Sequence, residues 1–237
     1  MQILLYILIG IFVLFVILGL AIANFADGQL DSYYNELGSD IAVLGLPAST
    51  FCQLVISSKL GGRIAVSRVA GVYGGRYLPG KARIELADDV YSSGSVAAIA
   101  VTAHELGHAL QFKENPKILV RNYKFSKLIK FLGMMLFPTF ISAIVLFLLD
   151  FIIISIILLS VCVLSFLLAL ALKIFTIRIE KQASKNAIGL LLEFSALSDE
   201  QLGRAKKLLS YAKMTYVADF FKALLCWTFL TKRTKIF

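Results

Sequence analysis

The feature that most constrains this chain is an apolar stretch of 45 residues, 131–175, in which only Asp150 and Lys173 carry a charge. As one straight helix this stretch would be about 67 Å long, roughly twice the thickness of the hydrocarbon core of a bilayer. Two crossings of about 20 residues each fit much better. We therefore predict a transmembrane helical hairpin with a tight turn near Asp150 and with both ends on one side of the membrane.

A second uncharged run, residues 3–23, is also long enough to cross the membrane as a helix. Residues 21–23 resemble the cleavage site of a secretory signal, but no Lys or Arg precedes Lys59 and the run is longer than a typical signal. We predict a retained anchor at 1–23. Because 59% of the residues are hydrophobic and the mean hydropathy is +0.82, we expect a multi-pass protein of the cell membrane.

Basic residues flank both ends of the predicted hairpin. The positive-inside rule places these flanks on the cytoplasmic side and the turn outside. The net charge of +9 comes from cations beside the predicted spans, so we expect the lipid bilayer with its anionic headgroups as partner, and no nucleic acid. The residues are Lys113, Lys117, Arg121, Lys124, Lys127 and Lys130 before the hairpin, and Lys173, Arg178, Lys181 and Lys185 at its exit.

The segment between the anchor and the hairpin, residues 24–130, is long enough for a small folded domain. Residues 63–69 and 82–86 alternate in the manner of half-buried strands, and Gly and Pro residues mark turns around them. From Val96 to Phe112 the apolar period becomes helical, and Asn115-Pro116 closes that helix.

Both histidines of the chain fall inside this helix, in the sequence His104-Glu105-Leu106-Gly107-His108. This is the HExxH pattern, in which two histidines four residues apart lie on one helix face and bind one zinc ion. The glutamate between them serves as the general base of a metallopeptidase. We therefore predict zinc at His104 and His108, with Glu105 as the catalytic residue.

A catalytic zinc site needs a third protein ligand, and no histidine is left to supply it. Glu180 is the best candidate, because it follows the hairpin directly and two crossings return it to the side that carries His104. The alternative is an ordinary solvated charge among its basic neighbours. A donor for the reaction's oxyanion is also expected, and the sequence does not rank its candidates: Tyr73, Tyr77, Tyr91, Tyr211 and Arg76.

Three blocks of the chain resemble the YugP-like neutral zinc metallopeptidases, a family of bacterial membrane proteins, over nearly its whole length. The blocks are residues 95–111 with the HExxH motif, 179–185 and 214–218. The resemblance implies zinc at His104, His108 and Glu180, and Glu105 as the catalytic acid and base.

Residues 180–184 also look like the ExxAD block of HtpX-type and prenyl-protein membrane proteases, in which the last acid orients a ligand histidine. Ser184 stands at that place here. Its hydroxyl can accept a histidine N–H but carries no negative charge, so we predict a weaker supporting role for it.

The expected fold class is an α-helical integral membrane protein with a small α+β zincin-like catalytic domain, in which short strands precede the HExxH helix. The predicted parts are the anchor at 1–23, the catalytic domain at 24–130, the hairpin at 131–175 and a helical segment at 176–237 that carries Glu180. In the last part, Ser198 to Gln201 form a capping box ahead of a helix through Lys213. Residues 214–230 are expected to lie in the membrane interface or to span it.

The predicted function is a membrane-anchored, gluzincin-type zinc metallopeptidase that cuts peptides or membrane proteins from the cytoplasmic side. Two alternatives stay open. An intramembrane protease would use Asp150 as its third zinc ligand, because ionisable groups inside a membrane are usually functional. A non-catalytic membrane scaffold would need no Glu105 between its histidines. The sequence identifies neither the substrate nor the oligomeric state.

Overall fold

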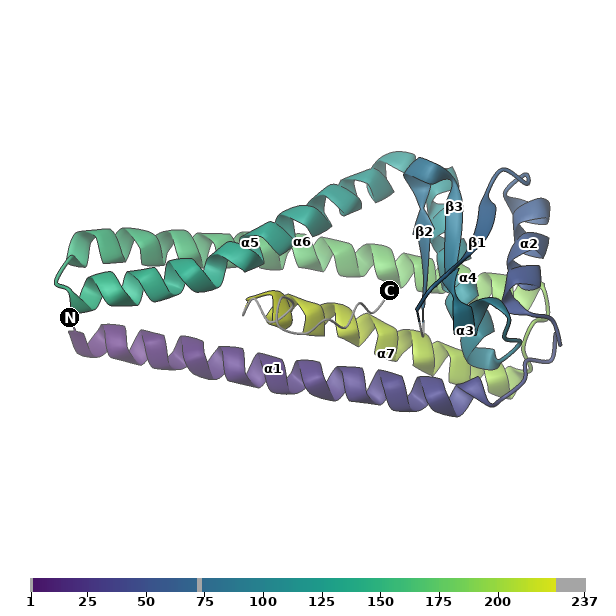
Figure 1. Cartoon of the computed structure of the whole chain (residues 1–237), viewed down its shortest axis with the longest axis horizontal. Coiled ribbons are helices and arrows are strands. Elements are labelled where there is room, and N and C mark those ends of the chain that lie inside the picture. Colours follow the sequence, from purple (N-terminus) through teal and green to yellow (C-terminus); the bar gives the residue numbers. More distant parts are fainter. Residues whose placement is uncertain (1, 72–73, 225–237) are drawn as a thin grey trace. The chain divides into compact units, whose positions relative to one another are not determined.

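The computed structural model describes residues 2–71 and 74–224, and most of them are helical (Figure 1). Within these residues a small sheet accompanies the helices. The helices are α1 (Gln2–Gly38), α2 (Ala48–Lys59), α3 (Asp88–Tyr91), α4 (Val96–Glu114), α5 (Pro116–Leu148), α6 (Ile152–Glu193) and α7 (Asp199–Leu224), and the strands are β1 (Ala65–Val69), β2 (Gly75–Leu78) and β3 (Arg83–Ala87).

The chain divides into two compact units, each made of segments that are distant in sequence. Of the described residues, 2–28, 124–176 and 214–224 form the apolar unit. The remaining described residues, 29–71, 74–123 and 177–213, form the mixed unit, which contains the sheet and both histidines. Predicted features that involve Tyr73 and residues 225–230 lie outside the described residues.

The apolar unit contains the predicted turn near Asp150, between the end of α5 and the start of α6. Asp150 is exposed and adopts φ = 62°, a left-handed conformation that Asp tolerates better than most residues. Both helices extend beyond the predicted hairpin, because the polar residues 116–130 and 176–193 continue the helical period.

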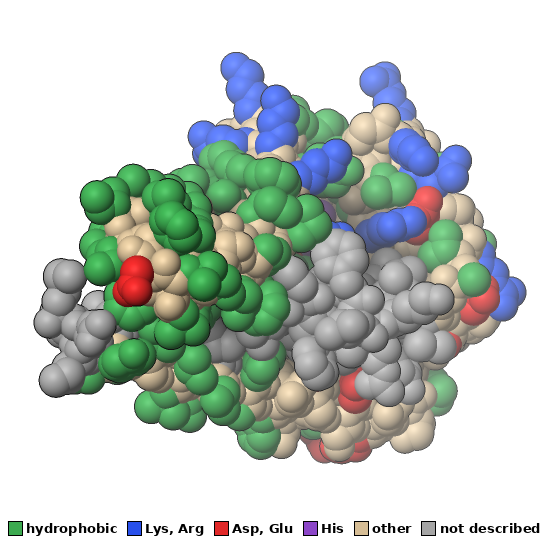
Figure 2. Space-filling model, turned by 60° about the vertical axis from the view of Figure 1, so that its left-hand side comes forward, with side chains coloured by type: hydrophobic (Ala, Val, Ile, Leu, Met, Phe, Trp, Pro, Cys, Tyr) green, Lys and Arg blue, Asp and Glu red, His purple; other side chains and the backbone are tan. Residues whose placement is uncertain are grey.

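Within the described residues, α5 and α6 are long and apolar enough to cross a membrane. Their outer surfaces are hydrophobic, and Ile153 is 77% exposed. In Figure 2 such side chains form a wide continuous patch on the face shown, while Lys and Arg side chains gather at its upper margin. An apolar surface of this extent suits a lipid environment. Crossing by residues 1–23 stays a prediction.

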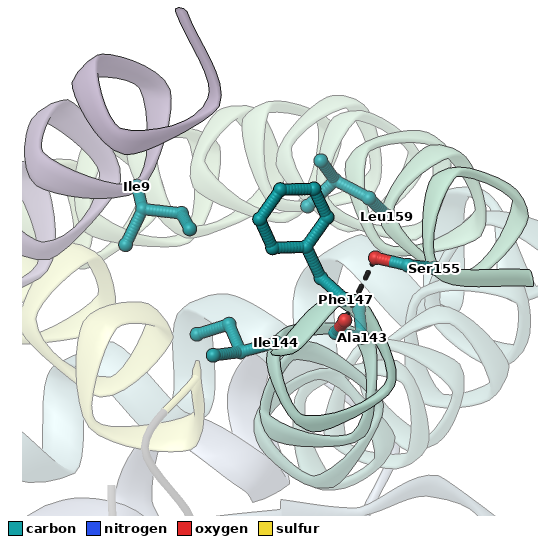
Figure 3. A pocket seen from close by; sticks show the side chains of 6 residues that line it. All are labelled: Ile9, Ala143, Ile144, Phe147, Ser155 and Leu159. Atoms are coloured by element: carbon teal, nitrogen blue, oxygen red, sulfur yellow. Dashed lines mark hydrogen bonds between the residues drawn. The ribbon is translucent and has the colours of Figure 1, made fainter. Parts of the chain in front are cut away.

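Helices α5 and α6 are linked by a side-chain hydrogen bond close to the turn between them. Ser155 donates a hydrogen bond to the Ala143 carbonyl at 2.7 Å, as Figure 3 shows. The neighbouring cavity, which Phe147 and Leu159 help to line, holds only about 10 Å³. That is the space of about one water molecule, so this cavity is too small for a substrate.

The mixed unit contains a three-stranded sheet in the order β1-β3-β2. Strand β3 pairs in parallel with β1 and antiparallel with β2. The predicted strands at 63–69 and 82–86 are confirmed as β1 and β3. Strand β2 was not predicted, because Gly74-Gly75 is typical of a turn, whereas Gly75 is the first residue of the strand.

Helix α4 lies at the centre of the mixed unit, and fourteen of its residues are buried. Ser95 is its N-cap and accepts a hydrogen bond from the Ala98 amide at 3.2 Å. The helix ends at Glu114, two residues beyond the predicted end. The capping box is confirmed as well, because the Gln201 amide donates to the Ser198 hydroxyl at 3.2 Å before α7 begins.

The N-cap of α4 yields a stability prediction. In Ser95→Ala the Ala98 amide loses its buried acceptor, which should cost about 1 kcal/mol of unfolding free energy and lower the melting temperature in detergent. The matched control is Ser57→Ala, whose exposed hydroxyl bonds only to Leu54 in its own turn. Equal melting temperatures for the two variants would show that the cap contributes nothing.

Candidate metal centre

The two histidines lie one turn apart on α4 and face the same side. Their rings meet edge to face, with centroids 4.8 Å apart and planes at 84°. His104 is buried and His108 is partly buried. The helical spacing of the HExxH pattern has therefore produced a pair of convergent imidazoles.

Glu180 of α6 lies directly beside both imidazoles. Its Oε2 atom is 3.2 Å from Nε2 of His104 and 3.2 Å from Nε2 of His108. The carboxylate is only 5% exposed. The three residues can each offer a ligand atom within 4.8 Å of the others, so the structure brings together the three ligands that the sequence predicted.

The chemistry of these donors fits a zinc ion. Two imidazole nitrogens and one carboxylate oxygen form the His₂Glu set of catalytic zinc sites, which leaves a fourth position open. Zinc accepts nitrogen and oxygen ligands together, whereas magnesium and calcium prefer oxygen alone. The three donors converge on one buried point. An ion pair with a purely structural role would need only one histidine beside the glutamate.

His108 and Glu180 shift each other's pKa values, because their charges interact and they share a hydrogen bond. Burial works to lower the pKa of His108, but the charge of Glu180 and the hydrogen bond to it raise that pKa to about 9. Burial works to raise the pKa of Glu180, yet the charge of His108 and hydrogen bonds from both imidazoles hold it well below its usual range. A metal ion bound here would take the place of the proton that His108 shares with Glu180.

Helices α4 and α6 reach this distance because Gly107 has no side chain. A Cβ atom at Gly107 would overlap the backbone carbonyl oxygen of Ala183 and would also touch the Ala187 amide. Ala183 and Ala187 are fully buried at this contact. Asn186 closes it by donating a side-chain hydrogen bond to the Gly107 carbonyl at 3.3 Å.

The outer nitrogens of both rings also have partners. Nδ1 of His104 lies 3.4 Å from the Ser184 hydroxyl, as the sequence comparison with ExxAD blocks anticipated. Nδ1 of His108 lies 3.0 Å from Oε1 of Gln111. Sequence reasoning missed Gln111, although it follows His108 by three residues and so lies on the same face of α4.

Glu105 is buried and its carboxylate faces strand β2. Its Oε2 atom accepts a hydrogen bond from the Tyr77 backbone amide at 2.6 Å. Gly75 makes room for it, because a Cβ there would lie 3.0 Å from Cγ of Glu105. This explains why β2 begins with glycine.

The side chains of the other residues that the sequence singled out make different contacts. Arg76 pairs with Glu85 at 2.6 Å, on the face of the sheet opposite to Tyr77. The Tyr77 ring packs on Phe112, and burial raises the pKa of its hydroxyl. Asp150 belongs to the apolar unit. Tyr91 packs against the hydrophobic core and Tyr211 against Tyr33.

Two histidines one turn apart, a carboxylate beside both rings and a buried glutamate on the same helix form a candidate metal site. Residues 11–232 match the family described as "putative neutral zinc metallopeptidase", and the chain belongs to that family. The predicted resemblance is thereby confirmed.

The chain is also similar to the "putative membrane protease YugP" of Bacillus subtilis (strain 168), with 26% identity over 208 residues, 88% of this chain and 89% of the relative. No solved structure matches the chain.

The Gly107 contact yields a prediction for metal binding. In Gly107→Ala the new methyl group must push α4 away from α6, so we expect zinc content and melting temperature to fall together. The control is Gly189→Ala, the same substitution on α6 at an exposed position where an added Cβ meets no atom within 4 Å. That control should be neutral or stabilising by up to about 1 kcal/mol, because Ala favours helix. Full zinc content in Gly107→Ala would contradict the proposed importance of the contact.

Proposed function

We propose that this chain is a membrane-anchored zinc metallopeptidase of the gluzincin type. The observation that carries the proposal is the convergence of His104, His108 and Glu180 on one buried point, with Glu105 on the same helix. Family membership supports the metallopeptidase activity. A zincin-like arrangement is supported by the HExxH helix, a second helix that supplies a carboxylate, and a small sheet beside the general base.

The proposed chemistry follows from the side chains. A zinc ion held by the three ligands would activate a water molecule and polarise the carbonyl of the peptide. Glu105 takes the proton from the attacking water and passes it to the leaving amine. The Tyr77 amide holds one carboxylate oxygen of Glu105, so the other oxygen is left to receive the proton.

A catalytic role is favoured over a purely structural zinc site by the number of ligands. Structural zinc sites usually have four protein ligands, whereas this site offers three and leaves a position for water. A scaffold would also gain nothing from a buried glutamate next to its histidines. Intramembrane catalysis through Asp150 is less well supported, because Asp150 is exposed at the α5–α6 turn and Glu180 already lies beside both histidines.

The membrane association is supported by the apolar surfaces of α5 and α6 and by the name of the Bacillus relative. We propose a multi-pass protein of the cell membrane with its site on the cytoplasmic side, as the flanking basic residues predict. Its substrates would be peptides or membrane proteins near that surface.

The general-base role of Glu105 can be tested by amide substitution. Glu105→Gln should keep about one zinc per chain but lose peptide cleavage by a factor of roughly 100 or more, because the amide accepts no proton. The matched control is Glu114→Gln, the same change at an exposed position of α4, which should cleave like the wild type. Undiminished cleavage by Glu105→Gln would overturn the mechanism.

The third ligand can be tested on α6. Glu180→Ala should lose zinc and activity together, because only two protein ligands remain. Glu193→Ala is the control on the same helix: it removes only a surface ion pair with Lys59, which contributes little. Metal content is measured by elemental analysis of the detergent-solubilised proteins. Full zinc content in Glu180→Ala would refute this ligand set. Loss of zinc in Asp150→Ala would favour the intramembrane alternative.

A further inference from the structure

Gln111 links the metal centre to helix α6 through both ends of its side-chain amide. Its Oε1 atom lies 3.0 Å from Nδ1 of His108. Its Nε2 atom donates to the backbone carbonyl of Ile179 at 2.9 Å. Ile179 directly precedes Glu180, so one carboxamide connects one proposed ligand to the backbone beside another.

The two contacts fix the orientation of the amide. With Nε2 toward the Ile179 carbonyl, a donor meets an acceptor and Oε1 is directed at His108. The flipped amide would place two oxygens together at Ile179 and would direct an N–H group at the ring. Only the first orientation satisfies both partners.

This orientation determines the tautomer of His108. An amide oxygen only accepts hydrogen bonds, so Nδ1 of His108 must carry the hydrogen. When a metal ion binds, the ring must be neutral, and its lone pair would then lie on Nε2, the nitrogen on the side of Glu180. Metal-bound histidines commonly have their outer N–H held in this way, which orients the ring and raises its basicity.

We propose that Gln111 is the positioning residue of the metal centre: it sets the tautomer and ring orientation of His108 and holds α6 at Glu180. The proposal rests on the proposed zinc site. Gln111 is 8% exposed, so water cannot easily replace its two bonds. The corresponding contact of His104, with Ser184, is longer at 3.4 Å. The orientation of the ring is therefore held more firmly at His108 than at His104.

The test separates the two ends of the carboxamide. Gln111→Met keeps the length of the side chain and removes both bonds. Gln111→Glu keeps an oxygen acceptor for Nδ1–H of His108 and removes the donor to Ile179. The matched control is Gln53→Met, the same change at an exposed position of α2. Zinc affinity is measured by competition with a chelator for the full-length protein in detergent.

Gln111→Met should bind zinc roughly 10- to 100-fold more weakly than the wild type, as is typical when the partner of a ligand histidine is lost. Gln111→Glu should recover part of that loss, because a carboxylate is a strong acceptor for the imidazole N–H, whereas its other oxygen faces the Ile179 carbonyl without a hydrogen bond. Wild-type affinity in Gln111→Met, or equal losses in both variants, would overturn the proposal.

A second readout is independent of zinc. The chain has two histidines, so proton NMR of the nitrogen-15-labelled protein reports few imidazole N–H groups. The Nδ1–H signal of His108 should be protected from exchange in the wild type and in Gln111→Glu, and lost in Gln111→Met. If the wild type binds no zinc but shows this signal, the proposed function fails while the hydrogen bond stands; if the wild type lacks the signal, the Gln111 proposal fails.

Discussion

The close contact between α4 and α6 at Gly107 is the constraint on which the candidate site depends. The histidines come from one helix and the carboxylate from the other, and they are 72 or more residues apart in sequence. Only a position without a side chain lets the α4 backbone approach Ala183 so closely. Glycine is unfavourable inside a helix, but at this position it lets His104, His108 and Glu180 come together.

The ring nitrogens of both histidines and the carboxylate of Glu180 have hydrogen-bonding partners. Glu180 pairs with both His104 and His108, and Gln111 and Ser184 lie beside the outer nitrogens of the rings. Because an unpaired buried charge is costly, these contacts stabilise the histidines and Glu180 inside the mixed unit. Helix α6, which contains Glu180, is also one of the two helices among the described residues that are long and apolar enough to cross a membrane, so the proposed third ligand lies on a candidate membrane helix.

Local periodicity was enough to predict much of this arrangement. The helix with HExxH, the turn at Asp150 and the capping box at Ser198 depend on neighbouring residues, and all three are observed. Glu180 needed a topological argument, and the structure brings it to the histidines. Strand β2 and Gln111 could not be predicted, because Gly75 is required by Glu105 from another element and the Gln111 amide bonds to a carbonyl 68 residues away.

X-ray absorption spectroscopy of the zinc-loaded protein would decide whether these three residues bind the ion, because it reports the ligands without requiring a substrate. We expect two imidazole nitrogens at about 2.0–2.1 Å and carboxylate and water oxygens near 2.0–2.2 Å, and we expect Glu180→Ala to hold too little zinc to give this spectrum. A sulfur ligand at about 2.3 Å, or a single imidazole, would contradict a site built from His104, His108 and Glu180.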